Sequence, residues 1–224
     1  MTHPAYLLAR LNAKNVRFDV GSGGIPDLTP QDIAAALAFV PRGMGRELLC
    51  RVWWPDGATL TARDLSGQME AAQREEWASR ESAMLDAMLA VASHGGGASL
   101  HRAQGKYASA HARRWPKWVT DPEIGTLSPG YERTRIGVLA ELSKPGLCPA
   151  CGGRGELMTG NVLSICAGCK GTGRRQVSDQ WRAEALQITG SGYLRTWRPV
   201  YEWTLQLCVD ALATASRRFA EAVD

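Results

Sequence analysis

The sequence predicts a mainly α-helical protein, in which a helical N-terminal part precedes a C-terminal helix-turn-helix with a four-cysteine zinc-knuckle insertion and small β content. Three observations predict this fold. Apolar residues recur at three- and four-residue steps between helix-capping signals in the first hundred residues. Two glycine-tailed cysteine pairs, CPACGGRG and CAGCKGTG, occupy residues 148–155 and 166–173. Two further amphipathic segments, joined by Gly-Ser-Gly, follow the second pair.

Capping residues and turn sequences delimit the N-terminal helices. A Thr-Pro signal with an acidic residue in the first turn opens a predicted helix over 30–40. The segment MGRELLCRVWW predicts a second helix over 44–54, which the turn sequence Pro-Asp-Gly ends. Thr61 begins the longest predicted helix, over 62–93, and consecutive glycines end it.

The C-terminal half combines helices with the cysteine segment. A Ser-Pro signal predicts a helix over 129–142, and the cysteine segment follows at 147–175. Ser178 caps a shorter predicted helix, and a long final helix runs to near the end of the chain. Pro199 lies inside that last helix, so we expect a kink or a late start there, because proline lacks the amide hydrogen that a helix needs.

We expect three regions along the chain. A helical N-terminal region covers 1–94, a basic linker or long loop covers 95–128, and a zinc-containing helix-turn-helix domain covers 129–224. The middle region is interpreted as a linker because it has no clear apolar period and contains Gly, Pro and a basic run.

Basic residues concentrate in two segments, although the net charge of the chain is only +4. Between His101 and Trp118 there are five basic residues and no acidic one. Between Arg133 and Arg182 there are eight basic residues and three acidic ones. This asymmetry favours a polyanionic partner for the basic part, although a solvated basic face would give the same counts.

Neither a membrane span nor a secretory signal is expected. No stretch approaches the roughly 18 apolar residues that cross a bilayer, and the N-terminus lacks the long apolar segment of a signal peptide. We therefore expect a cytoplasmic protein with no membrane partner. In that compartment, clustered cysteines hold metal more often than they form disulfides.

The clustered cysteines predict one structural zinc ion. Cys148, Cys151, Cys166 and Cys169 have the spacing C-x2-C-x14-C-x2-C, and the following glycines let the backbone turn its amides toward the sulfurs. Four thiolates close the tetrahedral shell of Zn²⁺, so no position is left for a substrate. A redox pair is disfavoured because no βαβ pattern surrounds either motif. Buried thiols without metal are disfavoured because the surrounding glycines and bases make no apolar core.

The glycine tails also resemble the repeat of DnaJ-type co-chaperones. That family's zinc domain has four such repeats, whereas this chain has two, and His3-Pro4 continues with Ala5 instead of completing a His-Pro-Asp signature. A zinc-stapled DnaJ-like chaperone or protein-interaction module is therefore the alternative function. An enzyme is not expected, because the chain has no catalytic nucleophile motif, acidic metal cluster or phosphate-binding glycine loop.

The helix pair after the cysteines predicts contact with DNA. In the second helix, Leu194, Trp197, Tyr201 and Leu205 are expected to pack inward, which leaves arginines near the start of that helix on another face. A helix-turn-helix presents such early side chains to base edges in the major groove, where arginine can bind guanine through two hydrogen bonds. An ordinary exposed helix face is the alternative.

The candidate DNA-binding residues divide by position. Arg195 and Arg198 on the second helix would read bases, and the basic side chains of the cysteine segment would contact phosphates, which position a protein without specifying sequence. The complete predicted set is Arg195, Arg198, Lys170, Arg174, Arg175 and Arg154.

The stretch from Cys148 to Cys208 resembles the Q antitermination proteins of lambda-type bacteriophages. The resemblance includes both glycine-tailed cysteine pairs, CKGTG around the last predicted ligand, and the run RTWRPVYE at 195–202 that leads to Cys208. Weaker similarity extends to LTPQDIAAAL and GMGRELLC near the N-terminus. Other families share the cysteine motif, but its combination with the following helix pair is more specific.

The resemblance implies a phage late-gene transcription antitermination factor. Such a factor binds double-stranded DNA near the late promoter and associates with host RNA polymerase holoenzyme, including sigma factor and core. It then makes the polymerase read through pauses and terminators. For this chain, the resemblance implies that the four clustered cysteines hold zinc and that Arg195 and Arg198 read DNA. It also implies polymerase contacts in the region 1–94, in the host bacterial cytoplasm.

Overall fold

The structure is a computed structural model of the chain and describes residues 7–8, 11, 30–58, 62–118, 129–143, 146–159, 162–175 and 177–223. It is mainly helical, as predicted. In chain order its elements are α2 (Pro30–Ala38), α3 (Met44–Trp53), the 3-10 turn η2 (Pro55–Gly57), α4 (Ala62–Ser93), α5 (Gly97–Ala112), α6 (Pro129–Ser143), β1 (Glu156–Thr159), β2 (Val162–Ile165), α7 (Asp179–Ala185), α8 (Gly190–Gly192), the π-helical turn η3 (Tyr193–Trp197) and α9 (Arg198–Val223). The predicted caps at Thr29 and Thr61 lie outside the described residues.

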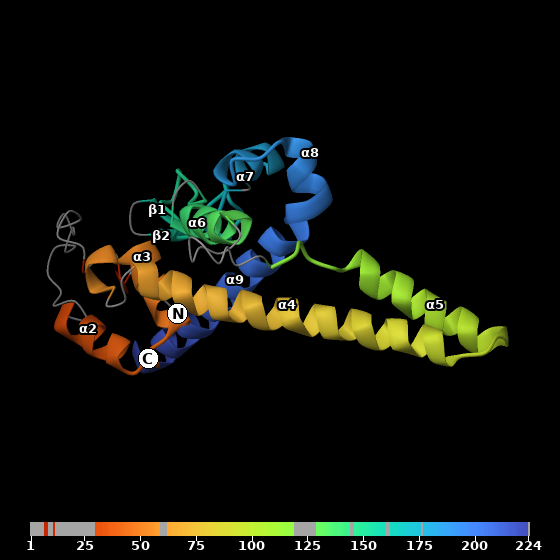
Figure 1. Cartoon of the computed structure of the whole chain (residues 1–224). Coiled ribbons are helices and arrows are strands. Elements are labelled where there is room, and N and C mark those ends of the chain that lie inside the picture. Colours follow the sequence, from red (N-terminus) through yellow and green to blue (C-terminus); the bar gives the residue numbers. More distant parts are fainter. Residues whose placement is uncertain are drawn as a thin grey trace, which may run out of the picture.

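Helix α9 is the centre of a helical body, which also contains α2, α3, α6, α7 and the first half of α4 (Figure 1). Helices α2, α3 and α6 pack against α9, and one apolar core joins them. Leu48 and Leu49 of α3, Leu142 of α6, and Tyr201 and Phe219 of α9 are all 0% exposed. The N-terminal and C-terminal regions expected from the sequence therefore contribute to the same core.

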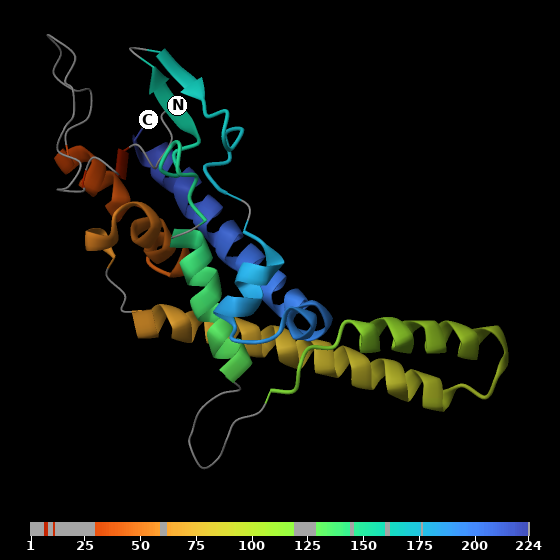
Figure 2. The same cartoon turned by 90° about the horizontal axis from the view of Figure 1, so that it is seen from above.

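Helices α4 and α5 form an arm that projects from the helical body (Figures 1 and 2). Helix α4 begins in the body, where Leu65 and Met69 are buried, and α5 packs back along its C-terminal half. The expected linker or long loop over 95–128 is thus corrected for residues 97–112, which form α5, while 119–128 lie outside the described residues. Helix α5 is rich in Ala, Gly and Ser, and its buried residue is Ala103. Its sequence therefore shows little of the recurrence of large apolar residues at three- and four-residue steps by which a helix is predicted.

A buried polar network fixes α6 against α4 and α9. The guanidinium of Arg135, 3% exposed, donates to Ser66 Oγ at 2.9 Å and to Gln73 Oε1 at 3.0 Å. It also donates to Glu70 Oε2 at 3.2 Å. Gln73 Nε2 in turn donates to Thr204 Oγ1 of α9 at 2.8 Å. A buried polar group that loses its partner costs about 1–3 kcal/mol, so these bonds define how the three helices align.

Glu141 of α6 holds α7 and α9 in place. Its two carboxylate oxygens accept hydrogen bonds from Arg182 at 2.8 and 3.0 Å, and one of them also accepts from the Tyr201 hydroxyl at 2.8 Å. Burial acts to lower the pKa of Arg182, but its bonds to Glu141 outweigh burial and raise that pKa. Burial beside Glu141 raises the pKa of Tyr201. The short helix α7 is therefore positioned by charge as well as by packing.

The π-helical turn η3 precedes Pro199, where the sequence predicts a kink or late start. The amide of Arg198 bonds to the carbonyl of Tyr193, five residues back, and α9 begins at Arg198. The chain is helical without a break from Gly190, so the last helix does not start late. The π-helical turn instead accommodates Pro199, because proline cannot donate the next helical bond and its ring crowds the carbonyl four residues earlier. The extra residue corrects the inward face: Tyr193 is 0% exposed, and Leu194, predicted to pack inward, is 50% exposed.

Candidate metal centre and the helix pair that follows it

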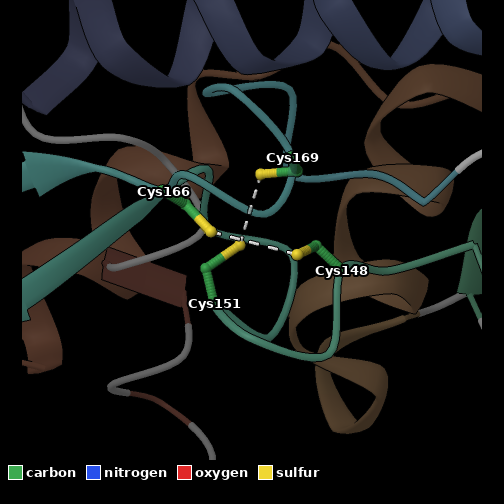
Figure 3. Close-up of side chains that lie close together, drawn as sticks. All are labelled: Cys148, Cys151, Cys166 and Cys169. Carbon is green, nitrogen blue, oxygen red and sulfur yellow. Dashed lines mark hydrogen bonds between the residues drawn. The ribbon is translucent and has the colours of Figure 1, made fainter.

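The four clustered cysteines meet at one point (Figure 3). Cys148, Cys151, Cys166 and Cys169 are 3%, 0%, 0% and 8% exposed, and their sulfurs all lie within 4.8 Å of one another. The Cys148 and Cys166 sulfurs are 4.0 Å apart, and the Cys151 and Cys169 sulfurs are 3.7 Å apart. Zinc–thiolate bonds of about 2.3 Å in a tetrahedron place sulfurs about 3.8 Å apart. The cluster is therefore positioned to hold one metal ion.

Glycines after each pair turn the backbone toward the sulfurs. The Gly155 amide donates to Cys151 Sγ, and the Gly173 amide donates to Cys169 Sγ, both at 3.2 Å. Gly155 has φ +79° and Gly173 has φ +69°, in the left-handed region that glycine adopts without strain. These amides stabilise negative charge on the sulfurs, as hydrogen-bond donors around metal-bound ligands do.

The two cysteine knuckles, residues 148–155 and 166–173, complete each other through reciprocal backbone bonds. The Cys148 amide donates to the Gly173 carbonyl at 2.9 Å, and the Cys166 amide donates to the Gly155 carbonyl at 2.8 Å. The knuckles also approach closely, since a Cβ built on Gly173 would clash with the Gly153 carbonyl oxygen. The glycine tails that the sequence displays are thus required by this contact.

A two-stranded hairpin joins the knuckles. Strands β1 and β2 pair antiparallel, with Leu157 opposite Ser164 and Met158 opposite Leu163. Leu157 packs against the cysteine cluster. On the other face, the hairpin exposes Met158 and Leu163 by 54% and 44%, and Ile165 by 72%. The sequence predicts small β content in this domain, and the hairpin supplies it.

The paired thiols Cys151 and Cys169 differ in their electrostatics. Burial acts to raise the pKa of Cys169, but hydrogen bonds from the Gly173 amide and from neighbouring thiols outweigh it and lower that pKa to about 7. At Cys151, burial prevails over the Gly155 amide and raises the pKa to about 11. A bound cation favours the thiolate form of every ligand.

The remaining thiols lie in the helical body, as expected for core residues. Cys50 and Cys208 are each 0% exposed. Burial, assisted by Glu47, raises the pKa of Cys50 to about 11, and burial raises the pKa of Cys208 to about 12. Both side chains therefore behave as neutral apolar groups at neutral pH.

The predicted phosphate contacts on the cysteine segment differ in exposure. Lys170 and Arg175 are exposed, and Lys170 directly follows Cys169 of the cysteine cluster. Arg154 is partly buried and donates from Nε to the Cys151 carbonyl at 2.8 Å. Arg174 is partly buried too, and burial lowers its pKa against the opposing influence of Glu141. Lys170 and Arg175 are thus the more accessible members of the predicted set.

The two arginines predicted to read bases also differ. Arg195 is exposed and donates from Nε to the Ser191 carbonyl at 3.3 Å. Arg198 is exposed but pairs with Glu202 at 2.8 Å and with Asp179 at 3.8 Å. Its bond to Glu202 is the largest of the influences that raise its pKa. Of these two arginines, Arg195 is therefore the one whose charge is not neutralised by an acidic side chain among the described residues.

The cysteine cluster and Arg195 lie toward opposite ends of the helical body. Figure 2 shows the β1–β2 hairpin beyond one end of α9 and α8 near the other end. Helix α9 has 26 residues, which corresponds to about 39 Å at 1.5 Å per residue. The predicted DNA contacts are consequently spread along the molecule and do not form one compact patch.

An aromatic cluster that sequence reasoning missed attaches the arm to the body. Trp118 stacks near Tyr131 of α6, with ring centroids 4.2 Å apart, and Trp115 meets Trp203 of α9 at 5.2 Å. The guanidinium of Arg80 lies 4.7 Å from the centre of the Trp115 ring. The sequence signal was the density of tryptophan around residues 115–118, inside the region interpreted as a linker.

No helix within the described ranges combines the length and the apolar character that a membrane crossing requires. Comparison with known proteins gives no family: no family model, curated protein or solved structure matches the chain.

Proposed function

We propose that this chain is a zinc-containing, DNA-binding transcription antitermination factor of the lambda Q type. The observation that carries the proposal is the order of motifs from Cys148 to Cys208. A glycine-tailed four-cysteine cluster is followed by two helices, and the second helix contains the sequence RTWRPVYE with Arg195 and Arg198. On this proposal the factor binds duplex DNA near a phage late promoter. It then joins bacterial RNA polymerase holoenzyme and makes it read through pauses and terminators.

Zinc is the proposed ion, because four buried thiolates with tetrahedral spacing suit its preference for sulfur and for four ligands. The ion would supply folding free energy and no chemistry at a substrate, since four sulfurs leave no open coordination position. On this proposal Cys148, Cys151, Cys166 and Cys169 are structural ligands.

Arg195 is the proposed base-reading residue. It is exposed at the start of the second helix, and no described carboxylate pairs with it. Lys170 and Arg175 are exposed as well and would contact phosphates. The spread of these side chains along the body suits a footprint of about one duplex turn, roughly 34 Å.

The test is transcription with purified bacterial RNA polymerase on a template that carries the phage late promoter and a downstream terminator. The wild-type chain should increase read-through. Arg195→Ala should lose about 1–3 kcal/mol of sequence discrimination, whereas Arg175→Ala should weaken all duplexes alike and lower the salt slope by about 0.9. Arg217→Ala, an exposed arginine near the end of α9, is the control. Absence of read-through by the wild-type chain would reject the proposal.

A protein-interaction module is the second candidate, favoured by one observation. The hairpin exposes Met158, Leu163 and Ile165 on one face, and such apolar side chains suit a protein partner. A chain with Met158→Ser and Leu163→Ser that retains metal and DNA binding but loses its effect on transcription would place the hairpin against a protein. If DNA binding is absent in the wild-type chain, this second function is the better description.

A further inference from the structure

The arm carries a groove that the proposed function does not use. Between α4 and α5 lies an open groove of about 730 Å³, whose charged lining comprises Arg80, Arg102, Lys106, Arg113 and Glu76. It therefore has four basic residues for one acidic residue. None of these residues belongs to the cysteine segment or to the helix pair that follows it.

The charges of the groove are mostly uncompensated. Glu76 pairs with Arg80 at 2.7 Å, and Arg80 also donates to the Arg113 carbonyl at 2.8 Å, so Arg80 is held in place. Within the part of the chain that the structure describes, no acidic side chain pairs with Arg102, Lys106 or Arg113. Three exposed positive charges thus remain available to a ligand.

Helix geometry aligns these three charges. Lys106 lies four residues after Arg102, about one turn along α5, and Arg113, which follows the last residue of α5 as its C-cap, lies eleven residues after Arg102, about three turns. The three side chains therefore form a row of about 16 Å along one side of the helix. A row of basic side chains at this spacing can contact successive anionic groups of a polymer, which a single small anion would not use.

The groove itself favours a phosphate backbone over other polyanions. Its lining contains no aromatic side chain, so it offers no platform on which the bases of a single strand could stack. It also contains no large apolar side chain of the kind that inserts into a lipid surface. Arginine guanidinium groups match phosphate oxygens through paired hydrogen bonds.

We propose that the α4–α5 groove is a second, sequence-independent binding site for the phosphate backbone of duplex DNA. Arg102, Lys106 and Arg113 of the arm bind the DNA phosphates, while Arg80 borders the groove from α4. This site positions a duplex without reading it, because it contacts phosphates only.

Gly105 provides a sharp test, since it lines the groove and a Cβ added to it meets nothing within 4 Å. Gly105→Glu places a carboxylate among the basic side chains without a clash, and Gly105→Gln places a neutral group of the same shape there. We expect Gly105→Glu to weaken binding of a labelled duplex of arbitrary sequence about tenfold at low salt, and Gly105→Gln to bind as the wild-type chain does. Equal loss in both variants, or loss in neither, would overturn the proposal.

A charge-removal series on the full chain provides the second readout. The triple change Arg102→Gln, Lys106→Gln, Arg113→Gln should lower the slope of log K against log salt by about 2 to 3. The matched control Arg42→Gln, Arg217→Gln, Arg218→Gln removes the same charge from exposed positions outside the groove and should leave the slope unchanged. Equal slopes for the two triple variants would overturn the proposal. A groove-dependent preference for single strands over duplex would overturn the choice of ligand.

Arg195→Ala separates this inference from the proposed function. If Arg195→Ala loses sequence preference while the groove variants bind as the wild type does, the groove proposal fails and the proposed function stands. If the groove variants lose duplex affinity while Arg195→Ala changes nothing, the groove proposal stands and the role assigned to Arg195 fails.

Discussion

The cysteine segment and the helical body are stabilised in different ways. The body has a continuous apolar core with residues from α2, α3, α4, α6, α7 and α9, and buried polar networks align its helices. The cysteine segment buries its four cysteines, and the partly buried Leu157 is the apolar side chain packed against them. Apolar burial therefore suffices for the body, whereas the segment has four cysteines positioned to hold a metal ion, which on the proposed function would hold its two knuckles together.

Loss of a metal ion from the cysteine segment and disruption of the apolar core of the body should therefore affect the stability of these two regions separately. Metal binding to four thiolates contributes on the order of 10 kcal/mol in zinc-finger peptides, and this free energy is available to the segment alone. The body gains its stability from apolar contacts that involve no cysteine ligand. The following changes attack one region at a time, beginning with the largest expected effect.

Cys151→Ser removes one metal ligand and should abolish stable metal binding, a loss on the order of 10 kcal/mol for the segment. Hydrogen exchange should show loss of amide protection in β1 and β2, while the helical circular dichroism signal stays close to that of the wild type. Cys208→Ser is the control, because Cys208 is buried in the body. It should retain full metal content and lower the melting temperature. Protected hairpin amides in Cys151→Ser would contradict the comparison.

Arg135→Met removes the centre of the buried network, so that Glu70 Oε2 and Gln73 Oε1 each lose the guanidinium that donates to them. We expect a loss of about 3–5 kcal/mol in the free energy of unfolding of the body, measured by urea denaturation, with unchanged metal content. Arg74→Met is a matched control, since Arg74 pairs with the same Glu70 at 3.4 Å but is 58% exposed. That change should cost less than about 1 kcal/mol. Equal costs would mean that the network does not align the helices.

Gly173→Ala should weaken metal affinity at least tenfold, measured by competition with a chromogenic chelator. The added Cβ would clash with the Gly153 carbonyl oxygen, and φ +69° adds about 1–2 kcal/mol of backbone strain. Gly152→Ala shares the strain, at φ +58°, but its Cβ meets nothing within 4 Å. The difference between the two variants measures the contact between knuckles. Identical affinities would show that the knuckles do not need this close approach.

Ser178→Ala tests the junction between the two regions and has the smallest expected effect. The Ser178 hydroxyl accepts from the Trp181 amide at 3.2 Å and caps α7. Its loss should lower the free energy of unfolding by about 1 kcal/mol, measured by urea denaturation. Ser178→Asp restores an acceptor and should recover most of that stability. If Ser178→Ala does not lower the free energy of unfolding, Glu141 alone positions α7.

Local signals predicted much of this arrangement. The cap at Ser178, the irregular helical turn before Pro199 and the convergence of the four cysteines each follow from residues that act on near neighbours. Helix α5 was missed because its Ala- and Gly-rich sequence packs on α4 with little apolar contrast. On the second helix, Trp197, Tyr201 and Leu205 pack against the core as predicted. Leu194 was wrongly predicted to pack inward in place of Tyr193, because a π-helical turn shifts the register and periodicity analysis assumes a regular helix.

Long-range partnerships could not be predicted in the same way. Nothing near Arg135 in the sequence identifies Gln73 or Glu70 as its partners, which are 62 and 65 residues away. The sequence likewise placed Arg174 with the exposed basic side chains, but its position between the knuckles and Glu141 is a property of the assembled fold. Residue spacing identified the cysteine cluster, whereas the accessibility of each basic side chain depended on tertiary packing.

The reciprocal bonds between the knuckles have a consequence for how the segment assembles. Each knuckle closes its own turn, but the amide of its first cysteine donates to a glycine carbonyl of the other knuckle, so this bond forms only when the two knuckles meet. A chain that has captured an ion with only two sulfurs therefore gains neither backbone bond. Ion capture and chain ordering should then proceed as a single all-or-none event, and metal titration should convert the hairpin directly from open to closed without a stable halfway form.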